Sequence, residues 1–447
     1  MDGQPQPTDR FRVVGLVGAT GMIVAAMVGS GIFALTGSFG AKVGTESNIL
    51  FAWVVGGVLA LAGGLSLAEL GAMIPCSGGS VEFARRAFGK ATGYLVAMVT
   101  ILAGYFLSIA AVGLMMADYA NKLLPSPVHG HAIAAAAIVA AYASQLTGLR
   151  AGFAFNTALS LVKIGFIALF VVLGLSWPVE PSVSGAAPAD APTVLSPAVA
   201  SAVLTVSFAY LGWSTGADIA GDVRDPGRNV PRSIITAIAL VFALYIGVNL
   251  VYLRVIEPAA MVEADGTPMQ AIGSVAATRI FGGAVGTAMT AAIALLLFST
   301  IVSGTITAAR ILESMAHARE APAPLGERTA RGIPMNALHV TLAASLACLA
   351  IGNLDDIFGL LTVLINAFSS LSVAAVIVLR RTMPDAPRPF RVPLYPITPL
   401  VYLALAGWSI AASVLDGGVR AIVSSIVVVA ALLIVRPLLS GGRKPAP

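Results

Sequence analysis

The stretch Met27-Val28-Gly29-Ser30-Gly31-Ile32-Phe33 lies about halfway along the first long apolar run of the chain and decides how that run is interpreted. Each glycine in a helix interior costs about 1 kcal/mol relative to alanine, so Gly-Ser-Gly predicts a break in the helix. Unwound backbone at membrane depth is tolerated only where it is buried in protein or lines a cavity. Such breaks turn helix termini toward the bilayer midplane, where secondary transporters bind solutes. The stretch therefore favours a carrier over a membrane anchor.

The composition places the whole chain in a membrane. Of the 447 residues, 57% are hydrophobic and 11% are charged, whereas soluble domains carry about 25% charged residues. Apolar runs of about 20 residues, the length that crosses a bilayer, recur throughout. They predict an all-α integral membrane protein with about twelve spans, at 13–41, 48–75, 91–122, 131–147, 153–177, 198–222, 233–256, 284–312, 334–352, 355–380, 395–415 and 419–439.

The predicted spans form one transmembrane domain over residues 13–439, between an N-terminal tail (1–12) and a C-terminal tail (440–447). With the N-terminus inside, twenty Lys and Arg residues fall in inner segments and five in outer segments. This asymmetry follows the positive-inside rule and places both tails in the cytoplasm. It also explains the net charge of +5 without a nucleic-acid partner. The bias toward Arg, Ala and Gly is typical of GC-rich bacteria, so we expect a bacterial inner-membrane protein.

A second break is predicted five spans after the first. The sixth span carries Tyr210-Leu211-Gly212-Trp213-Ser214-Thr215-Gly216 in mid-membrane. Interrupted segments at corresponding positions of two halves are typical of inverted-repeat transporters and mark their binding site. Five spans per half force the halves into opposite orientations. The prediction is therefore a five-plus-five repeat, spans 1–5 and 6–10, with two further spans.

Lys163 is the residue whose burial costs most. It lies ten residues into the fifth span, about 15 Å along the helix axis. A charge at that depth costs about 2.5–3.5 kcal/mol on insertion scales. We interpret Lys163 as a coupling group that exchanges a proton, or as a fixed cation that braces the helices.

Other polar and aromatic side chains each have two possible roles. Asp218 would recognise a cationic solute or pair with the basic loops, and Glu69 would likewise have a functional role or pair with those loops. Tyr210 and Trp213 would contact a solute or simply pack. The hydroxyls of the eighth span would coordinate a cation or bond to carbonyls one turn back; they are Ser299, Thr300, Ser303 and Thr307.

Enzymatic chemistry is not indicated. The two cysteines, Cys76 and Cys348, form no disulfide framework, and the four histidines form no ligand cluster. The sequence contains no HExxH motif and no Ser/His/Asp set, so we predict neither an enzyme nor a metal site nor a cofactor.

Several motifs, spread over most of the chain, resemble the amino acid–polyamine–organocation (APC) superfamily. They are Gly29-Ser30-Gly31-Ile32-Phe33, Ala68-Glu69-Leu70-Gly71-Ala72-Met73-Ile74-Pro75, Arg86-Ala87-Phe88-Gly89, Asn156 with Lys163, Phe208-Ala209-Tyr210-Leu211-Gly212-Trp213, Asp225-Pro226 and Arg388-Pro389-Phe390-Arg391-Val392-Pro393.

The resemblance implies an amino acid held between spans 1 and 6. In the family, N–H groups at the first break bind the carboxylate of the solute, here those of Ser30, Gly31 and Ile32. Carbonyls at the second break receive its amino group. The substrate site that the resemblance implies comprises Val28, Gly29, Ser30, Gly31, Ile32, Phe208, Ala209, Tyr210, Gly212 and Trp213. Lys163 matches a lysine that stands, in several members, where sodium sits in sodium-coupled relatives.

The expected function is amino acid transport by alternating access, either as a proton symporter or as an exchanger. Ser214 departs from an acidic residue that some cationic-substrate exchangers carry, so Ser214 and Asp218 are the positions expected to bear on specificity. The alternatives are an exchanger of polyamines or cationic amino acids and a sensor that binds amino acids without moving them. No feature of the sequence demands a partner subunit.

Overall fold

Helices α1 (Leu16–Met27) and α2 (Gly31–Val43) form one broken span in the computed structural model of the chain, and their axes differ by 41°. Val28 leaves helical geometry with φ −73° and ψ 83°, at the predicted break. The structure describes residues 14–29, 31–76, 78–146, 149–178, 191–317, 320–329, 332–415 and 419–439. Ser30, a predicted site residue, lies outside these ranges, as do the two predicted tails.

The remaining helices of the first half follow the predicted spans closely. A short connecting helix, α4, joins the second span to the third, and a π-helical turn interrupts the third span. The helices are α3 (Glu46–Met73), α4 (Gly79–Phe88), α5 (Lys90–Ile101), the π turn η2 (Leu102–Leu107), α6 (Ser108–Asn121), α7 (Gly130–Gln145) and α8 (Leu149–Ser176).

The second half opens with the other broken span. Helix α9 ends at Ala209, and the short helix α10 begins at Thr215, so that five residues separate them at the predicted break. The helices are α9 (Pro197–Ala209), α10 (Thr215–Asp218), η3 (Ala220–Asp222), α11 (Pro226–Val255), η4 (Pro258–Ala260), α12 (Ile272–Phe281), α13 (Gly283–His317), η5 (Ala323–Gly326), α14 (Met335–Leu349), α15 (Leu354–Thr382), α16 (Ile397–Ser413) and α17 (Val419–Leu439).

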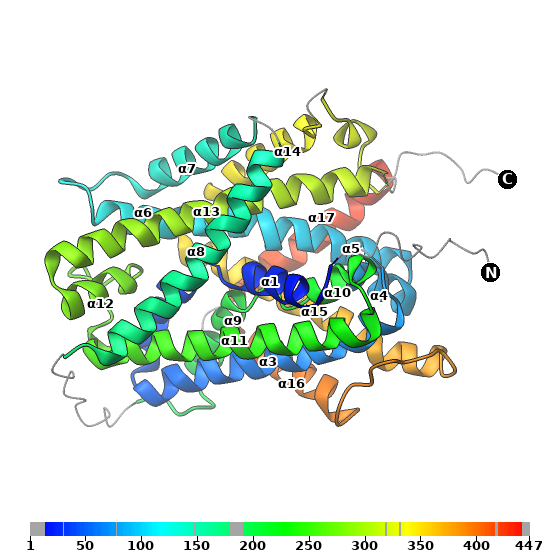
Figure 1. Cartoon of the computed structure of the whole chain (residues 1–447), viewed down its shortest axis with the longest axis horizontal. Helices are drawn as coiled ribbons and strands as arrows, with labels where there is room; N and C mark the ends of the chain where they lie inside the picture. The colour runs from blue at the N-terminus through cyan, green and yellow to red at the C-terminus, as the bar shows by residue number, and fades with distance from the viewer. Residues whose placement is uncertain are drawn as a thin grey trace.

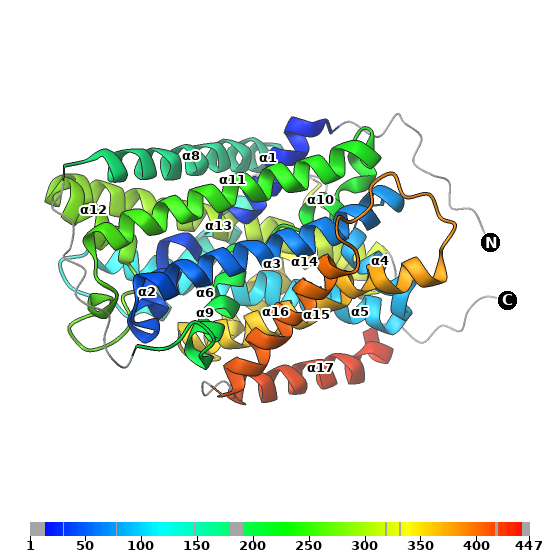
Figure 2. The same ribbon diagram turned by 90° about the horizontal axis from the view of Figure 1, so that it is seen from below.

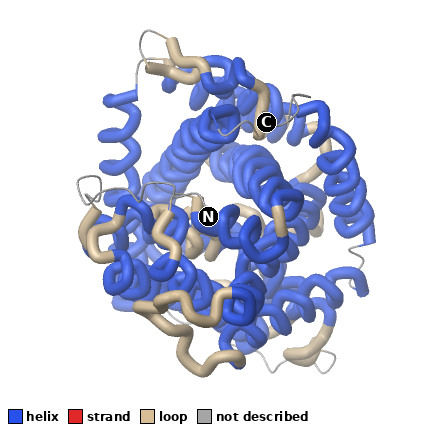
Figure 3. Tube along the Cα trace, turned by 90° about the vertical axis from the view of Figure 1, so that its right-hand side faces the viewer, coloured by secondary structure: helices blue, strands red, loops and turns tan. Residues whose placement is uncertain are grey.

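The prediction of an all-α membrane protein with about twelve spans is confirmed. Helix α3, the α5–α6 unit, α11, α13 and α15 are each long and apolar enough to cross a bilayer alone, and the α1–α2 pair makes a sixth span. Shorter apolar helices, among them α9, α14 and α16, account for further predicted spans. Within the described residues the regular structure is helical, apart from two isolated bridges (Figure 3).

Helices five spans apart pack against one another. Helix α3 packs on α11, α6 on α13 and α7 on α14; Figures 1 and 2 both show α3 and α11 side by side along the bundle. The contact of α1 with α11 has its counterpart in the contact of α9 with α3. An inverted repeat relates spans 1–5 to spans 6–10 by a pseudo-two-fold axis, and this pattern of pairs is what such an axis produces.

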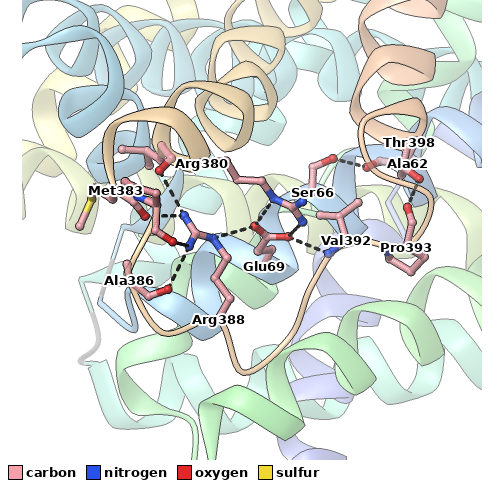
Figure 4. A network of polar contacts seen from close by, with 12 residues as sticks. Ala62, Ser66, Glu69, Arg380, Met383, Ala386, Arg388, Val392, Pro393 and Thr398 are labelled. Carbon is pink, nitrogen blue, oxygen red and sulfur yellow. Dashed lines mark hydrogen bonds and ion pairs between the residues drawn. The ribbon is translucent and has the colours of Figure 1, made fainter.

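A buried ion-pair cluster joins α3 to the last turn of α15 and to the loop that follows it (Figure 4). The carboxylate of Glu69, which is fully buried, accepts two bonds from Arg380, at 2.8 and 2.5 Å, and one from the N–H of Val392 at 2.7 Å. Arg388 lies 3.3 Å from the same carboxylate and also donates to the carbonyls of Met383 and Ala386. Of the two readings of Glu69, pairing with a basic loop is therefore the one observed.

Candidate functional site at the two broken helices

The breaks in spans 1 and 6 touch each other. A Cβ atom added to Gly31 would lie 2.8 Å from the Cβ and 2.9 Å from the Cα of Ala209, closer than real side chains approach. Gly212 has φ +108°, and a Cβ there would lie 2.7 Å from the backbone of Ala26. Each break therefore carries a glycine because the opposite broken helix occupies the space of a side chain.

The half-helices pack crosswise around this point. Helix α2 contacts α9, and α1 contacts α10. The N-terminus of α2, which begins at Gly31, thus lies beside the C-terminus of α9, which ends at Ala209. The first N–H groups of a helix and its last carbonyls have no partner within the helix, and they carry partial positive and negative charge. The crossing therefore offers donors for an anionic group next to acceptors for a cationic group.

Tyr245 of α11 holds the two breaks together. Its hydroxyl lies 2.8 Å from the carbonyl oxygen of Met27, the last residue of α1, and 3.0 Å from that of Ala209, the last residue of α9. The one hydroxyl hydrogen is shared between these two acceptors. A buried phenol in this position fixes the distance between the carbonyl ends of both half-helices.

The predicted site aromatics are packed side chains. Tyr210 is buried, donates to the carbonyl of Trp53 at 3.2 Å, and lies against the rings of Trp53 and Tyr245 at centroid distances of 6.1 and 5.2 Å. Trp213 packs edge-on against Tyr402 of α16, 5.7 Å between centroids. Both side chains therefore pack against residues of other helices.

Two further tyrosines bind the first turn of α2. The hydroxyl of Tyr252 donates to the carbonyl of Ile32 at 3.3 Å, and that of Tyr119 donates to the carbonyl of Phe33 at 2.6 Å. Tyr119 also accepts a bond from the N–H of Gly273 at 3.0 Å. These contacts join α2 to α11, α6 and α12, so the orientation of α2 depends on three other helices.

Lys163 lies in α8 and reaches across to α13. The residue is 6% exposed, and its ammonium group donates to Thr300 Oγ1 at 2.9 Å. Ser299, Thr300 and Thr307 each bond to a carbonyl one turn back on α13, as one reading of these hydroxyls predicts. The structure thus places Lys163 in contact with a hydroxyl of the eighth span, although the sequence analysis considered the two separately.

Asp218 accepts hydrogen bonds from the first residues of α4 and from Gly78, which precedes it. Its carboxylate accepts bonds from the N–H of Ser80, at 2.9 Å, and from the hydroxyl of Ser80, and its backbone carbonyl accepts the N–H of Gly78 at 2.8 Å. Ser214 also bonds to this carboxylate. The two positions predicted to bear on specificity are thus in contact, and Asp218 caps a helix.

The sequence analysis missed Tyr245, Tyr252 and Tyr119. A signal was available: Tyr245 and Tyr252 lie seven residues apart, so they share one face of their helix. Tyr245 also lies near the middle of its span, whereas membrane tyrosines gather at the interfaces. A tyrosine at mid-membrane needs a partner for its hydroxyl, which here is a carbonyl of a broken helix.

Comparison with known proteins identifies the family. A family model described as "Amino acid permease" matches residues 14–434. The chain is 28% identical to the serine/threonine exchanger SteT of Bacillus subtilis over 400 residues, 88% of this chain and 89% of that protein. It is 28% identical to the mouse large neutral amino acids transporter small subunit 2 over 404 residues, 87% of this chain and 74% of that protein. It is 26% identical to the mouse b(0,+)-type amino acid transporter 1, over 92% of this chain and 84% of that protein. The chain therefore belongs to the amino acid permease family of the APC superfamily, a family of transporters and not of enzymes.

Proposed function

We propose that this transporter exchanges neutral amino acids across the bacterial cytoplasmic membrane by alternating access. The observation behind the proposal is the crossing of the two broken helices, where the N-terminus of α2 lies beside the C-terminus of α9. The N–H groups of Gly31 and Ile32, with Ser30, receive the carboxylate of the amino acid. The carbonyls of Val28 and Phe208 receive its ammonium group. The carbonyl of Ala209 bonds to Tyr245 and retains a second lone pair for the same purpose.

Exchange is favoured over proton symport by two observations. One relative of similar length is named a serine/threonine exchanger. The ammonium of Lys163 bonds to a hydroxyl of α13 and occupies, by resemblance, the place of a coupling sodium ion. A cation that is part of the protein supplies that charge without entering from solution. Lys163 is then a bracing cation, and transport needs no sodium.

Neutral substrates are favoured over cationic ones by the contacts of Asp218. A side-chain ammonium at the membrane midplane needs a carboxylate partner, and Asp218 is the candidate that the sequence offers. Its oxygens already accept bonds from Ser80 and Ser214. A neutral substrate side chain does not need Asp218 as a carboxylate partner.

The orientation follows the charge pattern. The end of the bundle that carries α4 and the loop between α15 and α16 (Figure 2) holds Arg85, Arg86, Arg380 and Arg388, and we assign it to the cytoplasm with both tails. One mammalian relative is named as a small subunit. We propose that the present chain transports without a partner subunit.

Proteoliposomes containing only this protein test the proposal. Uptake of labelled L-serine and L-leucine is measured with or without internal amino acid, with or without an inward proton gradient, and with choline in place of sodium. We expect uptake only when unlabelled amino acid is inside, independent of proton gradient and sodium. Uptake driven by the proton gradient alone would overturn exchange. Binding without any uptake would identify a sensor.

Variants of Lys163 separate bracing from coupling. We expect Lys163→Ala to slow exchange at least tenfold, about 1.4 kcal/mol, without making uptake sodium-dependent. Lys90→Ala, at the exposed start of α5, is the matched control and should exchange at the normal rate. A proton-driven uptake in wild type that Lys163→Ala removes would show a coupling role instead.

A further inference from the structure

The end of the bundle opposite the Glu69 cluster contains a cavity of about 630 Å³, which we call the outer chamber. Its walls come from the outer end of α6, the start of α7, the segment between α11 and α12, and the start of α15. The polar residues that matter for its chemistry are Asp118, Lys122, Glu263 and Asp355, and the apolar ones are Leu114 and Leu354.

The charges in the outer chamber do not cancel. Lys122 lies 2.9 Å from both carboxylate oxygens of Glu263, so these two groups neutralise each other. The lining holds three carboxylates, those of Asp118, Glu263 and Asp355, against the single lysine Lys122. Lys122 also attracts Asp118, and Lys42 attracts Asp355 from outside the lining. Both side chains are accessible, Asp355 more so than Asp118. The lining of the chamber therefore carries an excess of negative charge.

The arrangement suits an organic cation better than a metal ion. Among the described residues, no three His, Cys, Asp or Glu side chains converge on one point as metal ligands. The lining instead combines carboxylates of α6 and α15 with the apolar side chains of Leu114 and Leu354. An ammonium group with an attached apolar side chain matches both features.

The chamber adjoins the elements that hold the broken helix. Tyr119, which bonds to the first turn of α2, follows Asp118 directly in α6. Gly273, which bonds to Tyr119, lies two residues after Ala271 in the chamber wall. The chamber wall is thus linked to the first turn of α2 through Tyr119 and Gly273.

We propose that the outer chamber is an entry site that binds the ammonium group of an external amino acid, through Asp118 and Asp355, before the amino acid reaches the crossing. The inference rests on the proposed function and on its orientation. Clefts lined by charge of one sign raise the local concentration of an opposite charge by 10-fold or more. The chamber therefore lowers KM for the outside substrate and leaves the maximal rate unchanged.

A labelling experiment tests the chamber without requiring transport. Thr267→Cys, in a Cys76→Ser/Cys348→Ser background, places a thiol on the exposed part of the chamber wall. We expect a cationic methanethiosulfonate to react about tenfold faster, relative to its anionic counterpart, than in the Asp118→Asn/Asp355→Asn variant. L-serine should slow the cationic reagent only while the two carboxylates are present. Equal reagent ratios in both proteins, or protection by choline and not by L-serine, would overturn the proposal.

Uptake kinetics supply the second readout. We expect Asp118→Asn/Asp355→Asn to raise KM for external L-serine about tenfold with Vmax within twofold. Asp385→Asn removes the same charge from the exposed loop between α15 and α16, at the opposite end of the bundle, and should change neither. An unchanged KM in the double variant would refute the entry site and leave the exchanger proposal standing. Absence of uptake in wild type would refute the exchanger, while the labelling still decides whether the chamber binds L-serine.

Discussion

At the scale of single residues, the crossing of the broken helices depends on the missing side chains of Gly31 and Gly212 and on one hydroxyl group. Gly31 leaves room for Ala209, and Tyr245 bonds to the carbonyl ends of both half-helices. The first is a matter of space and the second of hydrogen bonding, so they can be tested separately.

Replacing Gly31 by alanine should separate the two breaks. The new methyl group would lie 2.8 Å from the side chain of Ala209 and 2.9 Å from its backbone, and such overpacking costs about 1–3 kcal/mol. We expect exchange in proteoliposomes to fall at least tenfold. Gly21→Ala, in the same span, meets nothing within 4 Å and should keep normal activity and melting temperature. Normal exchange by Gly31→Ala would show that the close approach is not needed.

Tyr245→Phe should weaken the crossing without changing its shape. The variant removes the hydroxyl that donates to the carbonyl of Ala209, and an unsatisfied buried group costs about 1–3 kcal/mol. The carbonyl of Met27 keeps the N–H of Gly29 as a donor. We expect lower thermal stability and a slower exchange rate. Tyr94→Phe serves as the control, because the Tyr94 hydroxyl makes only a 3.5 Å contact with the carbonyl of Leu432. Equal effects of the two substitutions would argue against a special role for Tyr245.

At the scale of elements, directed hydrogen bonds attach both the broken first span and the unbroken helix α3 to their neighbours. The Glu69 cluster ties α3 to the loop that leads into α16. The tyrosine hydroxyls tie α2 to α6 and α11. Helix α2 is thus attached to its neighbours by directed hydrogen bonds as well as by packing.

Glu69→Gln should destabilise the protein strongly. The substitution leaves the guanidinium groups of Arg380 and Arg388 without their anion in a buried place, which costs about 3–5 kcal/mol. Glu82→Gln removes a carboxylate that pairs with Arg85 and Arg86 in partly exposed positions, where an ion pair is worth about 1 kcal/mol or less. Thermal unfolding in detergent compares the two. Similar losses of stability would show that the Glu69 cluster is no stronger than a surface pair.

At the scale of the whole molecule, the charge pattern predicts opposite exposure of the two ends. In a Cys76→Ser/Cys348→Ser background, we expect Thr267→Cys to be labelled in intact cells by a membrane-impermeant maleimide. Asp385→Cys, in the loop between α15 and α16, should be labelled only after permeabilisation. The reverse pattern would invert the assigned orientation and place the outer chamber in the cytoplasm.

The sequence by itself determined the span architecture and the positions of both breaks. Hydrophobic length and the distribution of Arg and Lys are local properties, because each span needs enough apolar residues of its own to cross the lipid, and its flanking charges set its orientation. The glycines of the first and sixth spans lie at the two breaks, whereas Gly56-Gly57 and Gly63-Gly64 lie within the continuous helix α3. For the same reason most helix bounds agree with the predicted spans to within a few residues; α11 is the largest departure and begins at Pro226, seven residues before the predicted span.

Only the tertiary structure decided which side chains serve the breaks. The hydroxyl of Tyr245 bonds to the carbonyl of Met27, 218 residues away in the sequence, and to that of Ala209, 36 residues away. No local sequence pattern predicts these contacts. The same holds for Lys163 with Thr300 and for Asp218 with Ser80. These pairings depend on how the two halves interlock, which is a property of packing between distant helices and not of hydropathy along one of them.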